Sequence, residues 1–358
     1  MHIGEICLLY TPVAFKSTTH SQRKLSTMAA IDERELYLPV DPDTILDAAV
    51  SSAGAGLDST AVAQQLDNST DLPKSLRSEY LFPKTPATAT VRPEGSNCVY
   101  LCGNSLGLQS KGVKVMLNEE LQKWEDFGVE GHFEGARPWV TIDEICVESM
   151  AKIVGAKPIE VCLMNTLSAN LHSMMTSFYR PETGPDKKRF KILAEAKSFP
   201  SDKFVFESQI RLHGLDPAEA LIELAPREGE NTLRTEDILA TIEKEGASIA
   251  LCLFSGVQYY TGQFFECGRI TAAAKAQGCN VGWDLAHAVG NTPLRLHDWD
   301  VDFACWCTYK YLNSGPGGVG GAFVHEKHAF AENSIPRQVC RSCQHVMVAR
   351  SQRLPLII

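Results

Sequence analysis

The sequence predicts an α/β fold with a mostly parallel central sheet and flanking helices. Short apolar runs alternate with amphipathic segments from residue 97 to residue 325. The runs are almost continuously apolar, which is typical of strands buried on both faces of a sheet. Strands that alternate with helices indicate a parallel arrangement. The predicted strands are Cys98–Cys102, Glu160–Met164, Phe190–Glu195, Ile249–Phe254, Asn280–Asp284, Phe303–Cys307 and Gly321–His325.

Three helices are predicted between these strands from apolar spacing and capping residues. Leu117, Leu121 and Trp124 recur at i, i+4 and i+7, the spacing of one helix face. Two acidic residues follow Thr235, as expected at the positive end of a capped helix. The predicted helices are Gly112–Gly128, Thr235–Gly246 and Phe265–Gly278.

The composition is that of a soluble globular protein. The chain has 358 residues, 44% of them hydrophobic and 22% charged. Its net charge of -9 argues against binding to nucleic acid or to an anionic membrane surface. No apolar run has the length of a membrane span. The twelve cysteines are scattered and many lie in apolar runs, so we expect a reduced, cytoplasmic protein.

Four segments are predicted along the chain. Residues 1–30 form a Ser/Thr-rich extension that we expect to be disordered. Residues 31–96 contain two weak amphipathic segments, and residues 97–330 form the large α/β domain. Residues 331–358 have no sustained hydrophobic period. Within this tail Cys340, Cys343 and His345 form a short cluster, but no fourth ligand follows at a standard zinc spacing, and no metal is predicted.

Lys310 lies where a predicted strand ends and a glycine-rich turn begins. A lysine at such a point is partly desolvated, so its amine can be neutral and can form a Schiff base. The alternative is a surface lysine before a turn. Asp284 ends another strand 26 residues upstream and suits a pyridinium nitrogen, although it is also a natural helix N-cap. His287 would stack over such a ring or hydrogen-bond near it, unless it is simply a satisfied buried histidine.

Polar residues follow three other strands and could form the rest of a binding site. The run 165–170 opens a helix with small hydroxylated residues, which suits a phosphate group or, alternatively, ordinary capping by Thr166 or Ser168. Phe199 could cover a planar ring or pack at the strand end. Ser255 lies at a strand's carboxyl end, the usual site edge of such sheets. With Asp284 and Lys310, this order of residues predicts a pyridoxal 5′-phosphate (PLP) enzyme.

The sequence resembles kynureninase, a PLP-dependent hydrolase of the aspartate aminotransferase fold, over residues 97–330. Other PLP enzymes of this fold share the aspartate and the lysine but not the longer strings. The strings that carry the resemblance are residues 101–109, 131–132, 137–139, 164–165, 196–202, 254–257, 260–263, 284–291, 297–299 and 302–313.

The resemblance implies a role for each matching residue. Lys310 would be the lysine that bonds to the cofactor, and Tyr309 would contact the phosphate and take part in proton transfer. Asp284 would pair with the pyridine nitrogen. The other implied cofactor contacts are Leu167, Ser168, Phe199, Pro200, Ser201, Asp202, Ser255 and His287, and the implied substrate contacts are Ser105 and His132.

The resemblance also implies an activity and a partner. Kynureninases hydrolyse L-kynurenine or 3-hydroxy-L-kynurenine to anthranilate or 3-hydroxyanthranilate and L-alanine, in tryptophan catabolism and de novo NAD biosynthesis. They act as homodimers. The chain stops matching near Phe330, so we expect the C-terminal small domain to be missing and turnover to be low.

Two alternatives remain open from the sequence. One is another PLP enzyme of the same fold, a desulfurase or an aminotransferase. The other is a non-catalytic fragment that pairs with an intact subunit. Finding which amino acid changes the cofactor absorbance would distinguish a kynureninase from another PLP enzyme. A borohydride-trapped adduct at Lys310 would distinguish either enzyme from a non-catalytic fragment.

Overall fold

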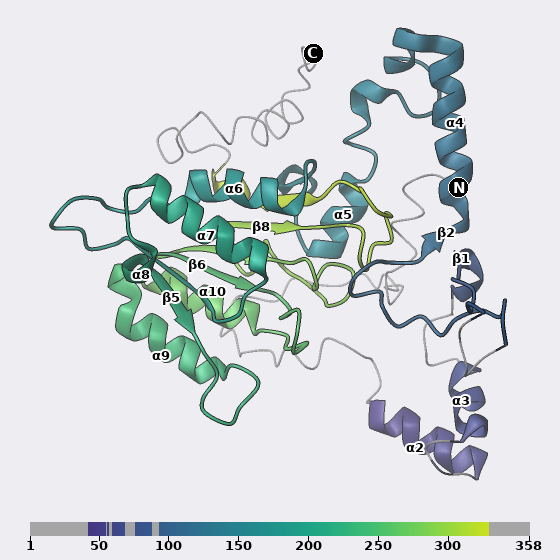
Figure 1. Cartoon of the computed structure of the whole chain (residues 1–358), viewed down its shortest axis with the longest axis horizontal. Helices are drawn as coiled ribbons and strands as arrows, with labels where there is room; N and C mark the ends of the chain where they lie inside the picture. The colour runs from purple at the N-terminus through teal and green to yellow at the C-terminus, as the bar shows by residue number, and fades with distance from the viewer. Residues whose placement is uncertain (1–41, 55, 57–58, 69–75, 88–92, 329–358) are drawn as a thin grey trace, which may run out of the picture. The chain divides into compact units, whose positions relative to one another are not determined.

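The computed structural model describes residues 42–54, 56, 59–68, 76–87 and 93–328 (Figure 1). They fall into two compact units, one ending at residue 81 and one beginning at residue 82. The predicted boundaries at residues 30 and 330, and the cysteine cluster of the tail, lie outside the described residues. The first unit contains helices α2 (Pro42–Ala53) and α3 (Thr60–Asp67). Ser59 caps α3 by accepting a hydrogen bond from the amide of Val62.

The second unit is built on a seven-stranded sheet with the order β3-β9-β8-β7-β6-β4-β5. Neighbouring strands are parallel from β8 through to β5, and β9 is antiparallel to both of its neighbours. The predicted α/β fold with a mostly parallel sheet is therefore confirmed. The strands are β3 (Val161–Leu163), β4 (Lys191–Glu195), β5 (Leu221–Leu224), β6 (Ile249–Ser255), β7 (Asn280–Asp284), β8 (Phe303–Trp306) and β9 (Gly321–Val324).

Helices cover both faces of this sheet (Figure 1). Helices α6 and α7 bury Leu171 and Phe206 in the hydrophobic core on one face, and α5, α9 and α10 bury apolar side chains in the core on the other. Because both faces are covered, the central strands are mostly apolar. The helices are α4 (Lys111–Phe127), α5 (Val147–Val154), α6 (Leu167–Phe178), α7 (Pro200–Leu212), α8 (Pro217–Ala220), α9 (Thr235–Glu245) and α10 (Cys267–Ala276).

Shorter elements connect these helices and strands. None of the helices in the described part of the chain has the length and apolar character needed to cross a membrane. The two-residue strands are β1 (Tyr80–Leu81) and β2 (Gln109–Ser110), and the 3-10 turns are η2 (Arg77–Glu79), η3 (Gly128–His132), η4 (Trp139–Thr141), η5 (Pro158–Glu160), η6 (Gly246–Ser248) and η7 (Glu326–His328).

Two predicted features of the sheet are wrong. The apolar run Cys98–Cys102 is not a strand, and Leu101 within it is 84% exposed. Strand β5 was not predicted, because it has only four residues, lies at the sheet edge and includes the exposed Glu223. Six of the seven predicted strands and all three predicted helices match observed elements, with ends shifted by up to two residues.

The parallel strands end together, and this edge positions the candidate site. Glu195 is the last residue of β4, Ser255 of β6 and Asp284 of β7. Ser255 is in register with Asp284, which in turn is in register with Cys305 of β8. Polar side chains distant in the sequence therefore meet at one edge.

Candidate active site

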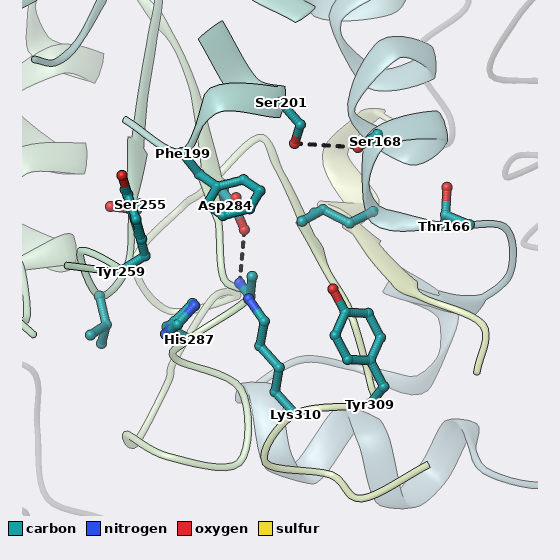
Figure 2. A pocket seen from close by; sticks show the side chains of 13 residues that line it. Thr166, Ser168, Phe199, Ser201, Ser255, Tyr259, Asp284, His287, Tyr309 and Lys310 are labelled. Atoms are coloured by element: carbon teal, nitrogen blue, oxygen red, sulfur yellow. Dashed lines mark hydrogen bonds between the residues drawn. The ribbon is translucent and has the colours of Figure 1, made fainter. Parts of the chain in front are cut away.

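A cavity of about 360 Å³ opens at the carboxyl ends of these strands (Figure 2). Its volume is within the range of small-molecule sites. Residues from three strand ends and from the starts of two helices contribute to it. The lining residues are Thr166, Leu167, Ser168, Phe199, Ser201, Ser255, Val257, Tyr259, Asp284, Ala286, His287, Tyr309 and Lys310.

Lys310 lies on the floor of this cavity and is only 8% exposed. Its side chain extends upward, and the amine points toward Asp284 (Figure 2). The Nζ atom is 5.7 Å from the centre of the Phe199 ring. Within the described residues, no group accepts a hydrogen bond from this amine. The Nζ atom remains accessible from the cavity, so the amine is available to a group that binds there.

The backbone around Lys310 is fixed by a loop from much earlier in the chain. The amide of Gly107 donates a 2.8 Å hydrogen bond to the carbonyl of Tyr309. A Cβ atom on Gly107 would lie 2.2 Å from the carbonyl oxygen of Lys310, so only glycine allows this approach. The string 101–109 therefore supports the backbone that presents the lysine.

Asp284 lies opposite Lys310 and is 3% exposed. Its Oδ1 atom accepts a 2.8 Å hydrogen bond from the amide of Ala286, which turns the chain away from the strand. This contact is the short local bond expected of an Asp at a turn. The carboxyl group still lines the cavity and faces Lys310 across it (Figure 2).

Two more buried acids accompany Asp284. Glu195 is 2% exposed and accepts a 2.5 Å hydrogen bond from the Ser255 hydroxyl. Burial raises the pKa of Glu195 to about 7 against the opposing hydrogen bonds from Ser255, and Asp284 raises it further. Asp202 is 3% exposed, and its Oδ1 atom has no partner within the described residues. Burial, then Asp284, raise the pKa of Asp202 well above its usual range.

The opposite end of the cavity is lined by two helix N-termini. Thr166 caps α6 through a 3.4 Å hydrogen bond from the amide of Ala169. The Ser168 hydroxyl of α6 donates to the Ser201 hydroxyl of α7 at 3.4 Å. Both helices thus direct their positive ends and small hydroxyl groups at one point (Figure 2), which suits an anion such as a phosphate group.

Aromatic and imidazole rings form the remaining walls. Phe199 meets the Tyr259 ring edge-on at 5.2 Å and is 43% exposed. Burial, and then the charge of Lys310, lower the pKa of His287 to about 4, so its ring is neutral at neutral pH. Burial, followed by the Cys307 thiol, raises the pKa of Tyr309. These rings can pack on a planar ligand without adding charge.

Nine residues predicted as cofactor contacts line the cavity together. Pro200 and Asp202 lie beside them at the start of α7 but are not in the lining. Ser105 and His132, predicted as substrate contacts, are also outside the lining. The predicted contacts that line it are Leu167, Ser168, Phe199, Ser201, Ser255, Asp284, His287, Tyr309 and Lys310.

Several site residues were not identified from the sequence. Val257, Tyr259 and Ala286 follow strand ends, but their types carry no chemical signal. Glu195 did carry a signal, since it is an acid at the end of a predicted buried strand. The same argument that selected Asp284 would have selected Glu195.

A second group of potential ligands lies at the opposite edge of the sheet. One nitrogen each from His297 and His325 and one Glu160 oxygen lie within 4.8 Å of one another. The Glu160 carboxylate already accepts bonds from His297 Nδ1 at 2.9 Å and from the amides of Lys157 and Glu326. His325 Nδ1 accepts from the amide of Lys327. Because these atoms have partners, we interpret the group as a hydrogen-bond network and not a metal site.

Comparison with a protein family and with solved structures indicates the general fold to which the chain is similar. Residues 216–334 match the family described as Aminotransferase class-V. A cysteine desulfurase from Thermococcus onnurineus NA1 is similar in structure, with a TM-score of 0.51 and 19% identity over 66% of this chain and 55% of that chain. The cystine C-S lyase C-DES gives a TM-score of 0.52 at 16% identity, over 64% of this chain and 57% of that chain. At these identities the likeness shows the fold.

The sequence matches are more specific, because the chain is similar to curated kynureninases over most of its own length. It is 57% identical to the kynureninase of Nematostella vectensis over 267 residues, which is 74% of this chain and 57% of that protein. It is 60% identical to that of Rattus norvegicus over 66% of this chain and 50% of the relative. It is 54% identical to that of Homo sapiens over 75% of this chain and 57% of the relative. The resemblance predicted from the sequence is confirmed, and the chain spans about half to three-fifths of these relatives.

Proposed function

We propose that the cavity binds PLP and that Lys310 is its covalent anchor. The observation that carries the proposal is the largely buried Lys310 side chain, whose amine lines the cavity, has no acceptor among the described residues and points toward Asp284. The kynureninase relatives and the C-DES variant with glycine linked to a PLP cofactor support this choice of ligand.

The residues present fit this cofactor. Asp284 is placed to hold a proton on a ring nitrogen, because its buried carboxyl group lines the cavity. Ser168 and Ser201, at the starts of α6 and α7, suit the phosphate group. The raised pKa of the buried Asp202 favours its protonated form, which can donate a hydrogen bond beside them. Phe199 offers a ring face for packing.

The chain's own groups supply binding and proton transfer. When bound, PLP supplies a ring that withdraws electrons from the substrate. Lys310 would take up the proton released at the substrate α-carbon, because its amine lines the cavity and has no acceptor among the described residues. His287 stays neutral and Tyr309 keeps its proton, so both hydrogen-bond without adding charge. The group that activates water is not assigned.

The reaction we propose is hydrolysis of L-kynurenine or 3-hydroxy-L-kynurenine to anthranilate or 3-hydroxyanthranilate and L-alanine. Its support is the 51–60% identity to kynureninases across most of the chain. The predicted substrate contacts Ser105 and His132 lie outside the cavity lining, so their role remains a proposal.

The activity is tested by adding L-kynurenine to the PLP-loaded chain and following anthranilate fluorescence. We expect anthranilate and alanine in equal amounts, and none from a Lys310→Ala variant. Cysteine desulfuration or transamination without anthranilate would contradict the reaction while leaving PLP binding intact.

We further propose that the protein is a homodimer. Helix α4 exposes an apolar row in which Leu117, Leu121 and Trp124 are 59%, 60% and 66% exposed. An apolar row of this kind is typical of a surface covered by another chain. Sedimentation of the chain and of a Leu121→Glu variant tests this. We expect the variant to be monomeric, and an unchanged dimer would exclude this face.

A cytoplasmic location is the last part of the proposal. No disulfide joins any of the nine cysteines that the structure describes, and six of them are buried. Free thiols are typical of a reducing compartment. Fractionation of cells that express the protein would test the location.

A further inference from the structure

Glu195 and Ser255 form a hydrogen-bonded pair at the edge of the cavity. The Glu195 carboxyl group accepts the Ser255 hydroxyl at 2.5 Å and the Ser255 amide at 3.3 Å on each oxygen. The residue that connects the Glu195 carboxyl group to the cavity by hydrogen bonds is therefore Ser255.

Ser255 connects this buried acid to the ligand space. Strand β6 lies between β4 and β7, so Ser255 lies between Glu195 and Asp284 across the sheet. Ser255 lines the cavity, whereas Glu195 does not. Any change in Glu195 that reaches the ligand must pass through the Ser255 hydroxyl or through charge.

The protonation state of Glu195 sets the direction of the Ser255 hydroxyl. When Glu195 is ionised it only accepts, so Ser255 donates its proton to Glu195 and presents lone pairs to the cavity. When Glu195 is protonated it can donate to Ser255 Oγ, which frees the serine proton to point into the cavity. We propose that Glu195 is a positioning residue that switches Ser255 between acceptor and donor toward the bound ligand.

The charged groups around Glu195 favour a change of state near neutral pH. Asp284 on β7 and Asp202 on α7 both oppose its ionisation, and Lys310 is a cation beside Asp202. His287, which lines the same cavity, is neutral in this range. Consistent with this geometry, burial brings the pKa of Glu195 to about 7. The three buried acids repel one another, so a proton on Glu195 reduces the repulsion among them.

The inference deepens the proposed function, because it takes PLP as the ligand. PLP carries a phosphate dianion and acceptor oxygens. A protonated Glu195 lowers the negative charge of the site and turns a donor toward the ligand. PLP should therefore bind more tightly when Glu195 is protonated, by about tenfold for one reversed hydrogen bond.

The variant Glu195→Gln fixes one state of the switch. Its amide oxygen can accept from the Ser255 amide while its NH₂ group donates to Ser255 Oγ, as protonated Glu195 does. The test is the dissociation constant of PLP between pH 6 and 8, measured by absorbance. We expect the wild-type affinity to fall relative to that of E195Q as pH rises, and E195Q to bind about tenfold more tightly at pH 8.

Two further variants separate the switch from a structural effect. Ser255→Ala removes the hydroxyl and keeps Glu195; its PLP affinity should change less between pH 6 and pH 8 than that of wild type does. Glu223→Gln makes the same change on exposed β5 and should follow wild type throughout. Identical pH profiles for wild type and E195Q would overturn the proposal. So would a Ser255→Ala variant that binds PLP like wild type at every pH.

The ligand-free chain gives a second readout that does not depend on PLP. If the proton is on Glu195, the midpoint of thermal unfolding of wild type should fall relative to E195Q as pH rises from 5 to 8. An unchanged difference would overturn the inference. Wild type that shows this difference but binds no PLP would contradict the proposed function and leave the protonation of Glu195 in place.

Discussion

At the amino edge of the sheet Asp302 is fully buried, yet its carboxylate accepts bonds from Lys275 at 2.7 Å, from His328 at 2.8 Å and from the amide of Val281. At the carboxyl edge Asp202 is almost as buried and has an oxygen without a partner in the described chain. Burial alone raises the pKa of both acids. At Asp302 the bonds from His328 and Lys275 outweigh burial and lower its pKa, whereas at Asp202 the neighbouring Asp284 raises it further.

This difference between Asp302 and Asp202 indicates that one acid stabilises the fold and the other contributes to ligand binding. Acids with matched partners stabilise the fold near neutral pH, because the folded state favours their charged form. Acids left unpaired in a cavity destabilise the empty protein and are compensated when a ligand brings the missing donors. The amino edge is thus built for the fold and the carboxyl edge for a ligand. Substituting an acid at one edge of the sheet should therefore affect either the unfolding free energy or the ligand affinity, but not both.

The largest effect is expected from Asp302→Asn. The change leaves Lys275 and His328 without their charged partner, and breaking a largely buried pair costs about 3 kcal/mol of unfolding free energy. Urea denaturation of the ligand-free chain measures the loss. PLP affinity of the folded variant should stay within about twofold of wild type, since the two edges act separately. A large loss of PLP affinity with normal stability would reverse the assignment.

At the other edge, Asp284→Asn should act on the ligand. Removing the charge that holds a ring proton costs about 1.5–3 kcal/mol of binding, or roughly 10- to 100-fold in the dissociation constant of PLP. The Ala286 amide keeps an acceptor in the Asn oxygen, so the unfolding free energy should change by less than about 1 kcal/mol. Unchanged PLP affinity would remove Asp284 from the binding site.

The unfolding free energy should depend on pH through the titration of Glu195. Its folded pKa of about 7 lies above the usual value of 4.5, so the folded chain holds a proton that the unfolded chain releases. The stability it contributes is full below pH 4.5 and is lost as pH rises toward 7, by on the order of 2–3 kcal/mol. Urea denaturation at a series of pH values should show this fall in wild type and a flatter curve in E195Q. A parallel pair of curves would contradict the raised pKa.

The smallest effect is expected from Asp300→Asn, the matched control for Asp302. Asp300 is at the same edge and pairs with Lys327, but its side chain is 54% exposed. Its backbone φ of 57° is one that Asn adopts readily. The unfolding free energy should fall by less than about 1 kcal/mol. A loss equal to that of Asp302→Asn would mean that burial is not what distinguishes the two acids.

The polar residues at the carboxyl ends of the parallel strands could be predicted from the sequence. Parallel strands end at one edge, so Ser255, Asp284 and Lys310 could be grouped from strand ends alone, and the structure places them around one cavity. Which buried acids have hydrogen-bond or ion-pair partners could not be predicted, because this depends on which side chains from other elements approach them. The strand pattern puts Asp284 at the end of one strand and Asp302 before the start of another, but it does not show that Asp302 meets Lys275 and His328.

Exposure of the loops was also beyond sequence reasoning. Cys98–Cys102 is as apolar as a strand, but no neighbouring strand pairs with it in the described structure. Strand β5 is short and partly polar, and its pairing with β4 creates it. In both cases tertiary pairing decides the structure and local composition does not.

The most direct test of the account is covalent trapping at Lys310. The chain is mixed with PLP, reduced with sodium borohydride, digested and analysed by mass spectrometry, with Lys310→Ala and Lys197→Ala variants in parallel. We predict one phosphopyridoxyl group on the peptide that contains Lys310, in wild type and in Lys197→Ala, and none at this site in Lys310→Ala. Label spread over surface lysines, or absent from Lys310, would contradict the claim that the carboxyl edge is built to hold this ligand.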